Sequence, residues 1–217
     1  MAQPRSRITT TCSAACVTDE ETALREYPTA PDWQVSQWFN THSPLSLGQL
    51  RGRVVLLHAF QMLCPGCVSH GVPQAERVHR EYAAHGVAVI GLHTVFEHHA
   101  AMMPAALEVF LHEYRVTHPV GVDVAGREGD PIPLSMRRYG LQGTPSLMLI
   151  DQAGRLRFHE FGRIDDLRLG IWLGRLLAEQ AGLIGDGTEE PNQVVPVESC
   201  DTQACPVDTR RGKDQPR

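Results

Sequence analysis

The sequence lacks several features that define other protein classes. Its longest apolar run, residues 54–57, stops at His58 and falls far short of the roughly 20 apolar residues that a membrane-spanning helix needs. There is no excess of basic residues, because the net charge is −5, and no basic patch is interleaved with aromatic side chains. We therefore expect neither a membrane nor a nucleic acid as a partner. Internal repeats are also absent.

The start of the sequence lacks the pattern of a secretion signal. Residues 1–16 contain two arginines, but no apolar stretch follows them. Cys12 also has no apolar lead-in of the kind that precedes a lipoprotein cysteine. We therefore expect a cytoplasmic protein.

The overall composition is that of an ordinary soluble globular protein. Hydrophobic residues make up 42% of the 217 residues and charged residues 21%, so the chain can bury a substantial core. The two ends of the sequence are polar and show little apolar periodicity. We therefore predict a flexible arm over residues 1–30, one folded domain over 31–184 and a disordered tail over 185–217.

Apolar periodicity predicts alternating strands and helices within that domain. The cluster Trp33, Trp38 and Phe39 begins the packed region, and a short extended segment with one helical turn follows at 45–50. Alternation then predicts a mainly parallel α/β sheet covered by helices on both faces, with an antiparallel edge added by the last hairpin. The predicted strands are 54–60, 87–92, 119–124, 146–150 and 155–161, and the predicted helices are 67–85, 104–114, 134–139 and 167–181.

The six cysteines fall into three close pairs, which in a cytosolic chain of this size indicate metal binding or redox chemistry rather than a disulfide framework. The central pair, Cys64 and Cys67, lies between a predicted strand and the start of a predicted helix. Free N–H groups and the partial positive charge of a helix N-terminus stabilise a thiolate, so we expect the pKa of Cys64 to fall below the free-thiol value of about 8.5. The other pairs are Cys12/Cys16 and Cys200/Cys205.

The residues of the Cys-Pro-Gly-Cys motif fit disulfide exchange. A thiolate at Cys64 is the species that attacks a disulfide, and Cys67, one helical turn later, can resolve the resulting mixed disulfide. Pro65 suits the first turn of a helix, because its missing N–H has no helical partner to lose. Gly66 leaves room for a partner chain near the sulfurs.

A metal site is the alternative interpretation of the same motif. A C-x-x-C pair can supply two zinc ligands, but no second pair follows at zinc-finger spacing. Histidines are abundant in the middle of the chain, yet none forms an H-E-x-x-H pattern. Redox chemistry is therefore favoured, and we expect no dedicated metal and no cofactor.

The dipeptide Thr144-Pro145 follows Gly143 and comes directly before a predicted strand. A tight turn at this place would permit a cis bond, whereas an ordinary loop proline would be trans. The residues alone leave both forms open.

With these motifs in view, residues from about 33 to 181 resemble the TlpA-like branch of the thioredoxin superfamily, related to the redoxins and alkyl hydroperoxide reductases. The matching stretches are LSLGQLRGRVVLLHAF, CPGC, VAVIGLHTVF, HPVGVD and YGLQGTPSLMLIDQAGRL. The resemblance implies a thioredoxin-like α/β fold, with a mixed central sheet, helices on both faces and a β-α insertion. It also implies that Cys64 is the nucleophile, that Cys67 is the resolving thiol, and that a cis Pro145 packs beside the disulfide. The backbone of Thr144 would pair with an extended substrate segment.

The sequence departs from that family's pattern at three positions. Leu63 stands where a Trp usually precedes the first cysteine, and His58 stands where relatives often carry Asp or Asn. The nearest counterpart of a Glu that some relatives place after the second cysteine is His70. One hypothesis is that His58 or His70 handles protons instead. The alternative makes His58 a hydrogen-bonded core residue and His70 a solvated helix residue.

The leading functional hypothesis is a protein-disulfide reductase that reduces or exchanges protein or small-molecule disulfides, with an electron donor that the sequence does not identify. A thiol peroxidase of peroxiredoxin type is an alternative, but it needs Thr or Ser three residues before the reactive cysteine, where Gln61 stands. A metal-binding module or chaperone is the third. Cys200 and Cys205 are either relay thiols for the central pair or exposed thiols without a function.

Overall fold

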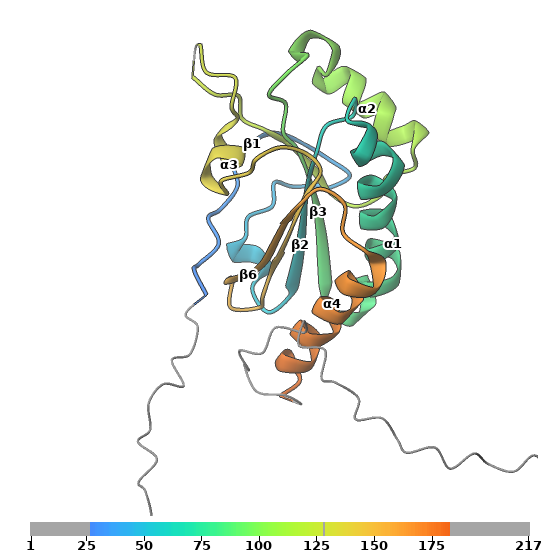
Figure 1. Ribbon diagram of the computed structural model, residues 1–217, viewed down its shortest axis with the longest axis vertical. Helices are drawn as coiled ribbons and strands as arrows, with labels where there is room; N and C mark the ends of the chain where they lie inside the picture. The colour runs from blue at the N-terminus through green and yellow to red at the C-terminus, as the bar shows by residue number, and fades with distance from the viewer. Residues whose placement is uncertain (1–26, 128, 183–217) are drawn as a thin grey trace, which may run out of the picture.

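The computed structural model describes residues 27–127 and 129–182, which form one six-stranded sheet with helices on both faces (Figure 1). The strands are β1 (Val35–Phe39), β2 (Val54–Phe60), β3 (Val87–His93), β4 (Val120–Asp123), β5 (Ser146–Ile150) and β6 (Leu156–Phe161). The helices are α1 (Val72–Tyr82), α2 (Pro104–Glu113), α3 (Leu134–Arg138) and α4 (Asp166–Gln180). None of the helices among the described residues is long and apolar enough to span a membrane.

The predicted arm and tail lie almost wholly outside the described residues. Where the arm is described, its last residues pack on the domain. The Leu156 N–H donates to the Pro28 carbonyl at 2.8 Å, the Ala30 N–H donates to the Gly154 carbonyl at 2.9 Å, and Ala30 is buried. The described residues 28–30, which the prediction assigned to the arm, are therefore packed on the domain, because backbone pairing of this kind leaves no periodic pattern in the sequence.

The sheet has the order β1-β4-β3-β2-β5-β6. β2 pairs in parallel with β3, and β3 pairs in parallel with β4, as the alternation of strands and helices predicts. The other pairings among the described strands, β1 with β4, β2 with β5 and β5 with β6, are antiparallel. The expectation of a mainly parallel sheet was therefore wrong, and the mixed sheet implied by the resemblance is the observed one.

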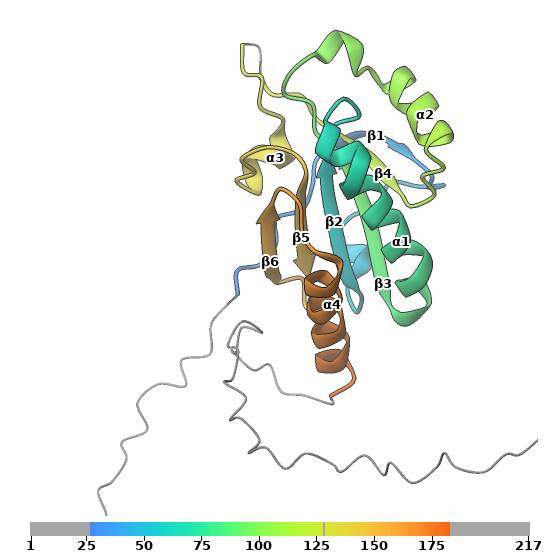
Figure 2. The same cartoon turned by 45° about the vertical axis from the view of Figure 1, so that its right-hand side comes forward.

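The central strand β2 is buried along its whole length and separates two cores. Successive side chains of a strand point to opposite faces. Leu56 accordingly packs with α1 and α4 on one face, while Leu57 packs with α3 and the segment before β1 on the other. Figure 2 shows α1 and α4 over the same face, with α3 on the side of β6. A third core joins Phe60, at the end of β2, to α2 and to Cys67.

The edge strand β1 is the element that the sequence did not predict. It pairs with β4 through the register Trp38↔Gly121, and its residues are half-buried or exposed. The aromatic cluster predicted a packing site here, and the rings of Trp33 and Trp38 do meet edge to face, with 6.2 Å between their centroids. An edge strand with only one partner and polar residues at Ser36 and Gln37 carries a weak apolar signal.

The helix predicted over 67–85 forms, but its first turn is wider than an α-helix. Residues Cys67–Gly71 form a π-helical turn, which continues into α1 and then into a short 3-10 turn that ends at Gly86. Pro73 has no N–H to donate to the carbonyl four residues earlier, so the regular helical bond is missing at this point. Gly86 has a φ of 92° and ends the helix in the left-handed conformation, as predicted.

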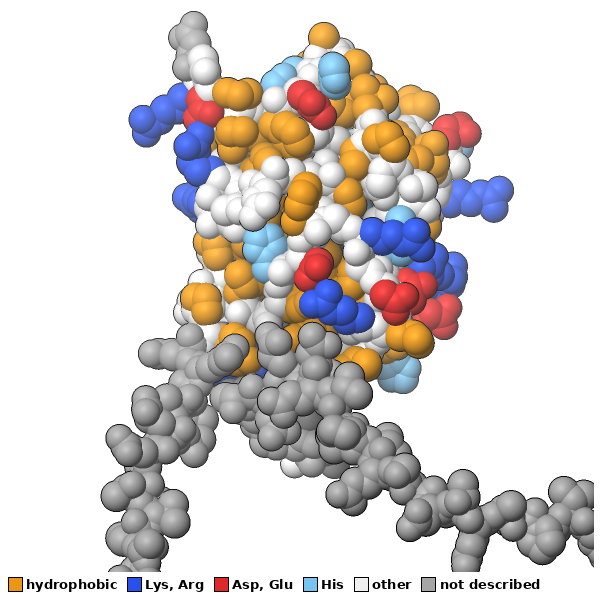
Figure 3. Space-filling view, in the orientation of Figure 1, with side chains coloured by type: hydrophobic (Ala, Val, Ile, Leu, Met, Phe, Trp, Pro, Cys, Tyr) orange, Lys and Arg blue, Asp and Glu red, His pale blue; other side chains and the backbone are white. Residues whose placement is uncertain are grey.

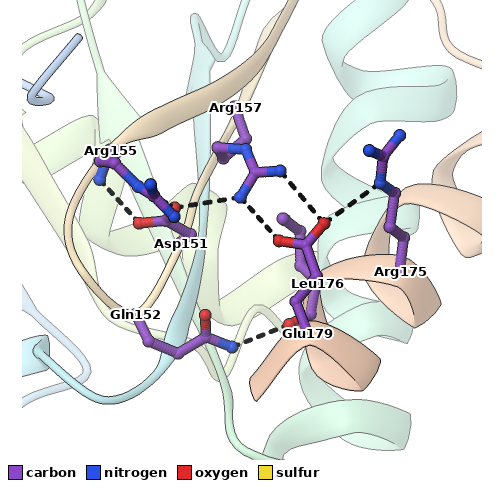
Figure 4. Close-up of polar contacts among 7 residues, drawn as sticks. All are labelled: Asp151, Gln152, Arg155, Arg157, Arg175, Leu176 and Glu179. Carbon is purple, nitrogen blue, oxygen red and sulfur yellow. Dashed lines mark hydrogen bonds and ion pairs between the residues drawn. The ribbon is translucent and has the colours of Figure 1, made fainter. Parts of the chain in front are cut away.

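A buried ion network joins the β5–β6 hairpin to the end of α4 (Figure 4). The fully buried Arg157 guanidinium donates to Asp151 at 3.2 Å and to both carboxylate oxygens of Glu179 at 2.7 and 3.1 Å. Arg155 also pairs with Asp151, at 2.7 Å, and Arg175 pairs with Glu179, at 3.1 Å. The network ties the outer edge of the sheet to the helix that packs beneath it.

Replacing Arg157 by Met should lower the free energy of unfolding by about 2 kcal/mol. Breaking a buried ion pair typically costs about 3–5 kcal/mol, but here each carboxylate keeps a second arginine. The matched control is Arg168→Ala, because Arg168 is half-exposed where it pairs with Glu160, and such pairs contribute less than about 1 kcal/mol. Urea unfolding of the two variants measures both values, and equal losses would contradict this role for the network.

Candidate active site

Cys64 caps the helical stretch that follows β2. Its carbonyl accepts the Val68 N–H at 3.0 Å, and its Sγ accepts the Cys67 N–H at 3.2 Å. Pro65 and Gly66 are the first helical residues, and both are exposed. A side chain that accepts an N–H from the first turn is the usual arrangement of a helix cap, and here the accepting atom is the sulfur. The sequence prediction that the motif begins a helix is confirmed.

The two cysteine sulfurs have different environments. Cys64 is partly exposed, whereas Cys67 is fully buried, and both are free thiols. The Cys64 thiol donates to the Thr144 carbonyl at 3.4 Å. Burial, with a smaller contribution from the hydrogen bond to Cys64, raises the pKa of Cys67 to about 12. The site thus presents one accessible sulfur and holds a second one protonated behind it.

The Thr144–Pro145 bond is cis, the form that the resemblance implied. Pro145 lies against the motif, because a Cβ built on Gly66 would meet the Pro145 Cδ at 3.3 Å. The glycine therefore makes room for this proline. On the other side of the turn, a Cβ on Gly143 would lie 2.9 Å from the ring of Phe161, so that ring covers the start of the loop.

Gln61 and Phe161 belong to the site, although neither was predicted from the sequence to have a role in it. Gln61 is buried, and its amide nitrogen lies 3.5 Å from the Thr144 hydroxyl, at the limit of a hydrogen bond. Phe161 pairs with Ser146 across the hairpin and is about half-exposed beside the cis proline. The position of Gln61, a polar residue in the turn just before the motif, could have indicated its place in the site. Phe161 can be assigned to the site only from its strand pairing with Ser146.

His58 lies in the core behind the motif. It is buried, and its ring stacks on Phe60 with 5.5 Å between centroids. Neither ring nitrogen has a hydrogen-bond partner in the part of the chain that the structure describes. Burial, with smaller contributions from His118 and His70, lowers the pKa of His58 to about 3. The alternative that made His58 a hydrogen-bonded core residue is confirmed in part. His58 is buried in the core, but the expected hydrogen bond is not observed among the described residues.

Gly71 is the residue that makes room for His58. A Cβ at Gly71 would lie 2.4 Å from the His58 Nε2 and 3.3 Å from the Pro145 Cβ. Gly71→Ala should therefore destabilise the protein by about 1–3 kcal/mol, the usual cost of overpacking a core. Gly174→Ala in α4 is the control, because its Cβ would meet nothing within 4 Å and should stabilise the helix by up to about 1 kcal/mol. Equal effects on the denaturation midpoint would show that Gly71 is not packed in this way.

His70 holds the motif's helix to the loop before α4. Its Nε2 lies 2.8 Å from the Ile164 carbonyl, which also accepts a hydrogen bond from Gln74 at 3.1 Å. The alternative that made His70 a solvated helix residue is not observed, because His70 is half-buried in this contact. No hydrogen bond joins His58 or His70 to a cysteine sulfur within residues 27–127 and 129–182. No group of three or more His, Cys, Asp or Glu side chains in these ranges could hold a metal ion.

Comparison with known proteins assigns the chain to a family. The family model for Redoxin matches residues 28–166, which include the motif, the cis proline and the whole sheet. The chain belongs to the Redoxin family. This redoxin shares 53% identity with a thioredoxin-like superfamily protein of known structure, over 70% of this chain and 97% of that one, with a TM-score of 0.68.

A second solved relative of the redoxin is a thiol-disulfide isomerase from Corynebacterium glutamicum. The two share 52% identity over 69% of this chain and 97% of that one, with a TM-score of 0.65. A DsbE-like thiol:disulfide interchange protein from Chlorobium tepidum, 22% identical with a TM-score of 0.57, shares the fold. The predicted thioredoxin-like fold and the assignment to the TlpA-like branch of the thioredoxin superfamily are confirmed. The redoxin is thus a member of a family of thioredoxin-like thiol-disulfide oxidoreductases.

The curated relatives are much longer proteins. Protein DipZ from Mycobacterium tuberculosis is 28% identical over 150 residues, which are 68% of this chain and 20% of DipZ. NHL repeat-containing protein 2 from Gallus gallus is 27% identical over 128 residues, which are 58% of this chain and 16% of that protein. The redoxin therefore spans about a fifth of the length of the curated relatives that it matches.

Proposed function

We propose that this redoxin exchanges thiols and disulfides with protein substrates through the Cys64–Cys67 dithiol. One observation carries the proposal: the partly exposed Cys64 sulfur caps a helix, at 3.2 Å from the Cys67 N–H, and faces the backbone of Thr144 at 3.4 Å. Negative charge on that sulfur is stabilised by the N–H and by the helix dipole. The oxidoreductase relatives support the same chemistry.

The reaction would proceed in two exchange steps. The Cys64 thiolate attacks one sulfur of the substrate disulfide, forms a mixed disulfide and releases the other substrate sulfur as a thiolate. Cys67 then loses its proton and attacks the Cys64 sulfur, which frees the second substrate thiol and closes the Cys64–Cys67 disulfide. The two protons of the dithiol end on the two substrate thiols, and two electrons pass to the substrate. The same steps in reverse oxidise a substrate dithiol.

The surroundings of Cys64 favour a polypeptide as the substrate. Leu63 and Phe161 are each about half-exposed, and no hydrogen bond engages the Thr144 N–H in the part of the chain that the structure describes. An extended segment could pair with Thr144 and place apolar side chains on the two exposed ones. On the face drawn in Figure 3, charged side chains gather over α1 and α4, whereas apolar side chains are frequent over the upper part of the domain.

The acid–base hypothesis needs His58 or His70 near a cysteine sulfur, and neither ring makes a hydrogen bond to one within the described residues. A histidine whose pKa is about 3 is also a weak proton acceptor at neutral pH. We therefore expect the His58→Leu variant to resolve the mixed disulfide at pH 7 at a rate within about twofold of the parent rate. The loss of a general base would slow this step much more. A slowing of the second step alone, by more than tenfold, would instead assign His58 the proton-handling role. Rapid-quench measurement separates the two steps.

The function is tested by mixing the reduced chain with a disulfide-bonded protein under anaerobic conditions. We expect one Cys64–Cys67 disulfide to form for each substrate disulfide reduced, as measured by acid quench, alkylation and peptide mapping. Oxidised glutathione is the matched small-molecule substrate, and we expect it to react more slowly because it offers no extended apolar segment. No loss of protein disulfide above the rate of a free thiol would refute the proposal.

A further inference from the structure

The buried Cys67 sulfur must become negatively charged before it can resolve the mixed disulfide, and within the described residues neither candidate histidine makes a hydrogen bond to it. The hypothesised relay thiols Cys200 and Cys205 lie outside the described residues. Gln61, by contrast, is a buried polar side chain beside the motif that the two exchange steps leave without a role. We propose that Gln61 is a positioning residue for the second step, whose side-chain amide holds the Thr144 hydroxyl toward the Cys67 sulfur. This inference rests on the proposed function and assigns a further residue to its site.

The stability of the fold does not account for a glutamine at this position. The Gln61 side chain is 1% exposed, and the residues on either side of it pack in the same core as Cys67. Its amide nitrogen has one hydrogen-bond partner among the described residues, the Thr144 hydroxyl at 3.5 Å, and its Oε1 has none. A buried carbonyl oxygen without a partner lowers stability, and an apolar side chain of the same size would avoid that loss.

Thr144 acts on the two sulfurs of the motif through different atoms. Its carbonyl accepts a hydrogen bond from the Cys64 thiol at 3.4 Å. Burial raises the pKa of Cys67 to about 12, and the Thr144 side chain acts in the opposite direction, as a hydroxyl that donates to a thiolate does. The hydroxyl therefore has the Gln61 amide on its acceptor side and the Cys67 sulfur on its donor side.

The second step begins with Cys64 joined to the substrate and with Cys67 as a thiol. Cys67 loses its proton and its thiolate attacks the Cys64 sulfur, so that the Cys64–Cys67 bond forms and the bond between Cys64 and the substrate breaks. The substrate sulfur leaves as a thiolate and takes up a proton. Thr144 keeps its own proton and donates a hydrogen bond to the Cys67 sulfur while the charge forms. The Gln61 N–H fixes the direction of this hydroxyl and strengthens it as a donor, since hydrogen bonds in a chain polarise one another.

The first step does not use the Gln61 side chain. The Cys64 sulfur accepts the Cys67 N–H at 3.2 Å and faces the Thr144 carbonyl, and both of these partners are backbone groups. Gln61 contributes only its carbonyl here, which accepts the Cys64 N–H at 3.2 Å and remains in every variant. Loss of the amide should therefore slow the second step alone.

The decisive experiment compares the full chain with its Gln61→Met variant in rapid-quench assays on a disulfide-bonded protein. The rate of the first step rises in proportion to the substrate concentration and that of the second does not, so the two rates can be separated. We expect Gln61→Met to slow the second step about tenfold at pH 7 and to leave the first within about twofold, the lower end of the effect of a hydrogen bond to a charged group. The pH profile of the second step should move about one unit higher, because tenfold less thiolate corresponds to one unit of pH. The free energy of unfolding should stay equal or rise.

Other ionisable groups do not account for such a shift of the pH profile. Cys64 is bonded to the substrate at this step. Burial lowers the pKa of His58 on β2 to about 3 and that of His93 on β3 to about 4, so both are uncharged between about pH 6 and pH 9. His70 contacts the Ile164 carbonyl, and the ionisable side chains of α1 and α2 are the same in parent and variant.

Gln74→Met is the matched control. Gln74 is also a buried glutamine, and its amide donates to the Ile164 carbonyl at 3.1 Å and to Asp166 at 2.6 Å. Removing these two bonds should lower the free energy of unfolding and leave both exchange steps within about twofold of the parent. This is the reverse of the pattern expected at Gln61.

Variants of Thr144 test the other end of the contact. Thr144→Val removes the hydroxyl but keeps the carbonyl, and it should slow the second step at least as much as Gln61→Met does. Thr144→Ser keeps the hydroxyl and should restore most of the rate. The Gln61→Met/Thr144→Val double variant should be no slower than Thr144→Val alone, because the amide acts only through the hydroxyl.

Three results would overturn this role of Gln61. These are an unchanged second step in Gln61→Met, an equal slowing of both steps, or effects of the two substitutions that multiply in the double variant. In each case the parent chain still forms the Cys64–Cys67 disulfide, and the proposed function stands. If the parent chain forms neither a mixed disulfide at Cys64 nor the Cys64–Cys67 disulfide, the exchange function itself is refuted.

Discussion

Replacing Cys64 by Ser is expected to abolish disulfide exchange completely, whereas replacing Cys67 by Ser should stop the reaction half-way. Cys64 carries the accessible sulfur that attacks, and a serine hydroxyl cannot form the mixed disulfide. The Cys67→Ser variant retains the attacking sulfur but has no thiol to release the substrate. We expect it to accumulate one covalently attached substrate per chain, as seen by mass spectrometry of the intact adduct.

The two variants are matched because each removes one sulfur from the same turn. Both should keep the fold, since neither cysteine is bonded to the other in the reduced protein. Circular dichroism and the denaturation midpoint check this. If the Cys64→Ser variant trapped substrate through Cys67, the assignment of the attacking and resolving sulfurs would be reversed.

Acid is expected to destabilise the protein strongly because of two buried histidines. Burial lowers the pKa of His58 to about 3 and that of His93 to about 4, whereas both titrate near pH 6.5 in the unfolded chain. Between these values the unfolded state binds more protons, so the free energy of unfolding falls as the pH falls. Each histidine should then cost about 2 kcal/mol at pH 5 relative to pH 8, with a limiting slope of about 1.4 kcal/mol per pH unit.

Urea unfolding between pH 5 and pH 8 measures this effect. His58→Leu and His93→Leu should each flatten the pH dependence, because all four ring nitrogens lack hydrogen-bond partners within the described residues and an apolar side chain leaves nothing unpaired. His112→Leu is the control, because it makes the same substitution at a histidine whose side chain is 86% exposed. Burial raises the pKa of Glu76, but hydrogen bonds from His118 and Thr117 together outweigh it and lower the pKa to about 2, so Glu76 adds acid sensitivity only below about pH 4.5.

An unchanged slope in the His58→Leu/His93→Leu double variant would contradict this account. Both rings contact Phe60, with centroids 5.5 and 5.3 Å from the Phe60 centroid, so their contributions need not add. The double variant therefore carries the test, and the single variants show how the effect is divided.

The sequence predicted the elements whose signal is continuous and local. β2 and β3 are buried over their whole length and appear as short apolar runs, and the capping position of Cys64 follows from a strand that ends where a helix begins. The edge strand β1 could not be predicted in this way, because its pairing with β4 involves residues far apart in the chain and none of its residues is fully buried.

Side-chain environments were harder to predict than elements. Histidine is a polar residue, and nothing in the sequence shows that the His58 ring lies in the core without a hydrogen bond among the described residues. The sequence also does not show that the His70 ring contacts the Ile164 carbonyl. Both environments depend on which residues the fold places next to the histidine. Gly71, for example, leaves space for the His58 ring. Arg157 illustrates the same point, since a charged residue in a strand pattern gave no sign of a fully buried ion network.

Redox titration of the full chain in dithiol or glutathione buffers is the most direct test of the central claim that Cys64 and Cys67 form a working redox couple. Alkylation and peptide mapping at each potential should show a single two-electron transition in which both cysteines disappear together into one Cys64–Cys67 disulfide. A strongly negative midpoint would identify a reductase, and one near the glutathione pool an exchanger or oxidant. If Cys64 became glutathionylated while Cys67 stayed a thiol at every potential, the couple would not exist and the proposed function would be wrong.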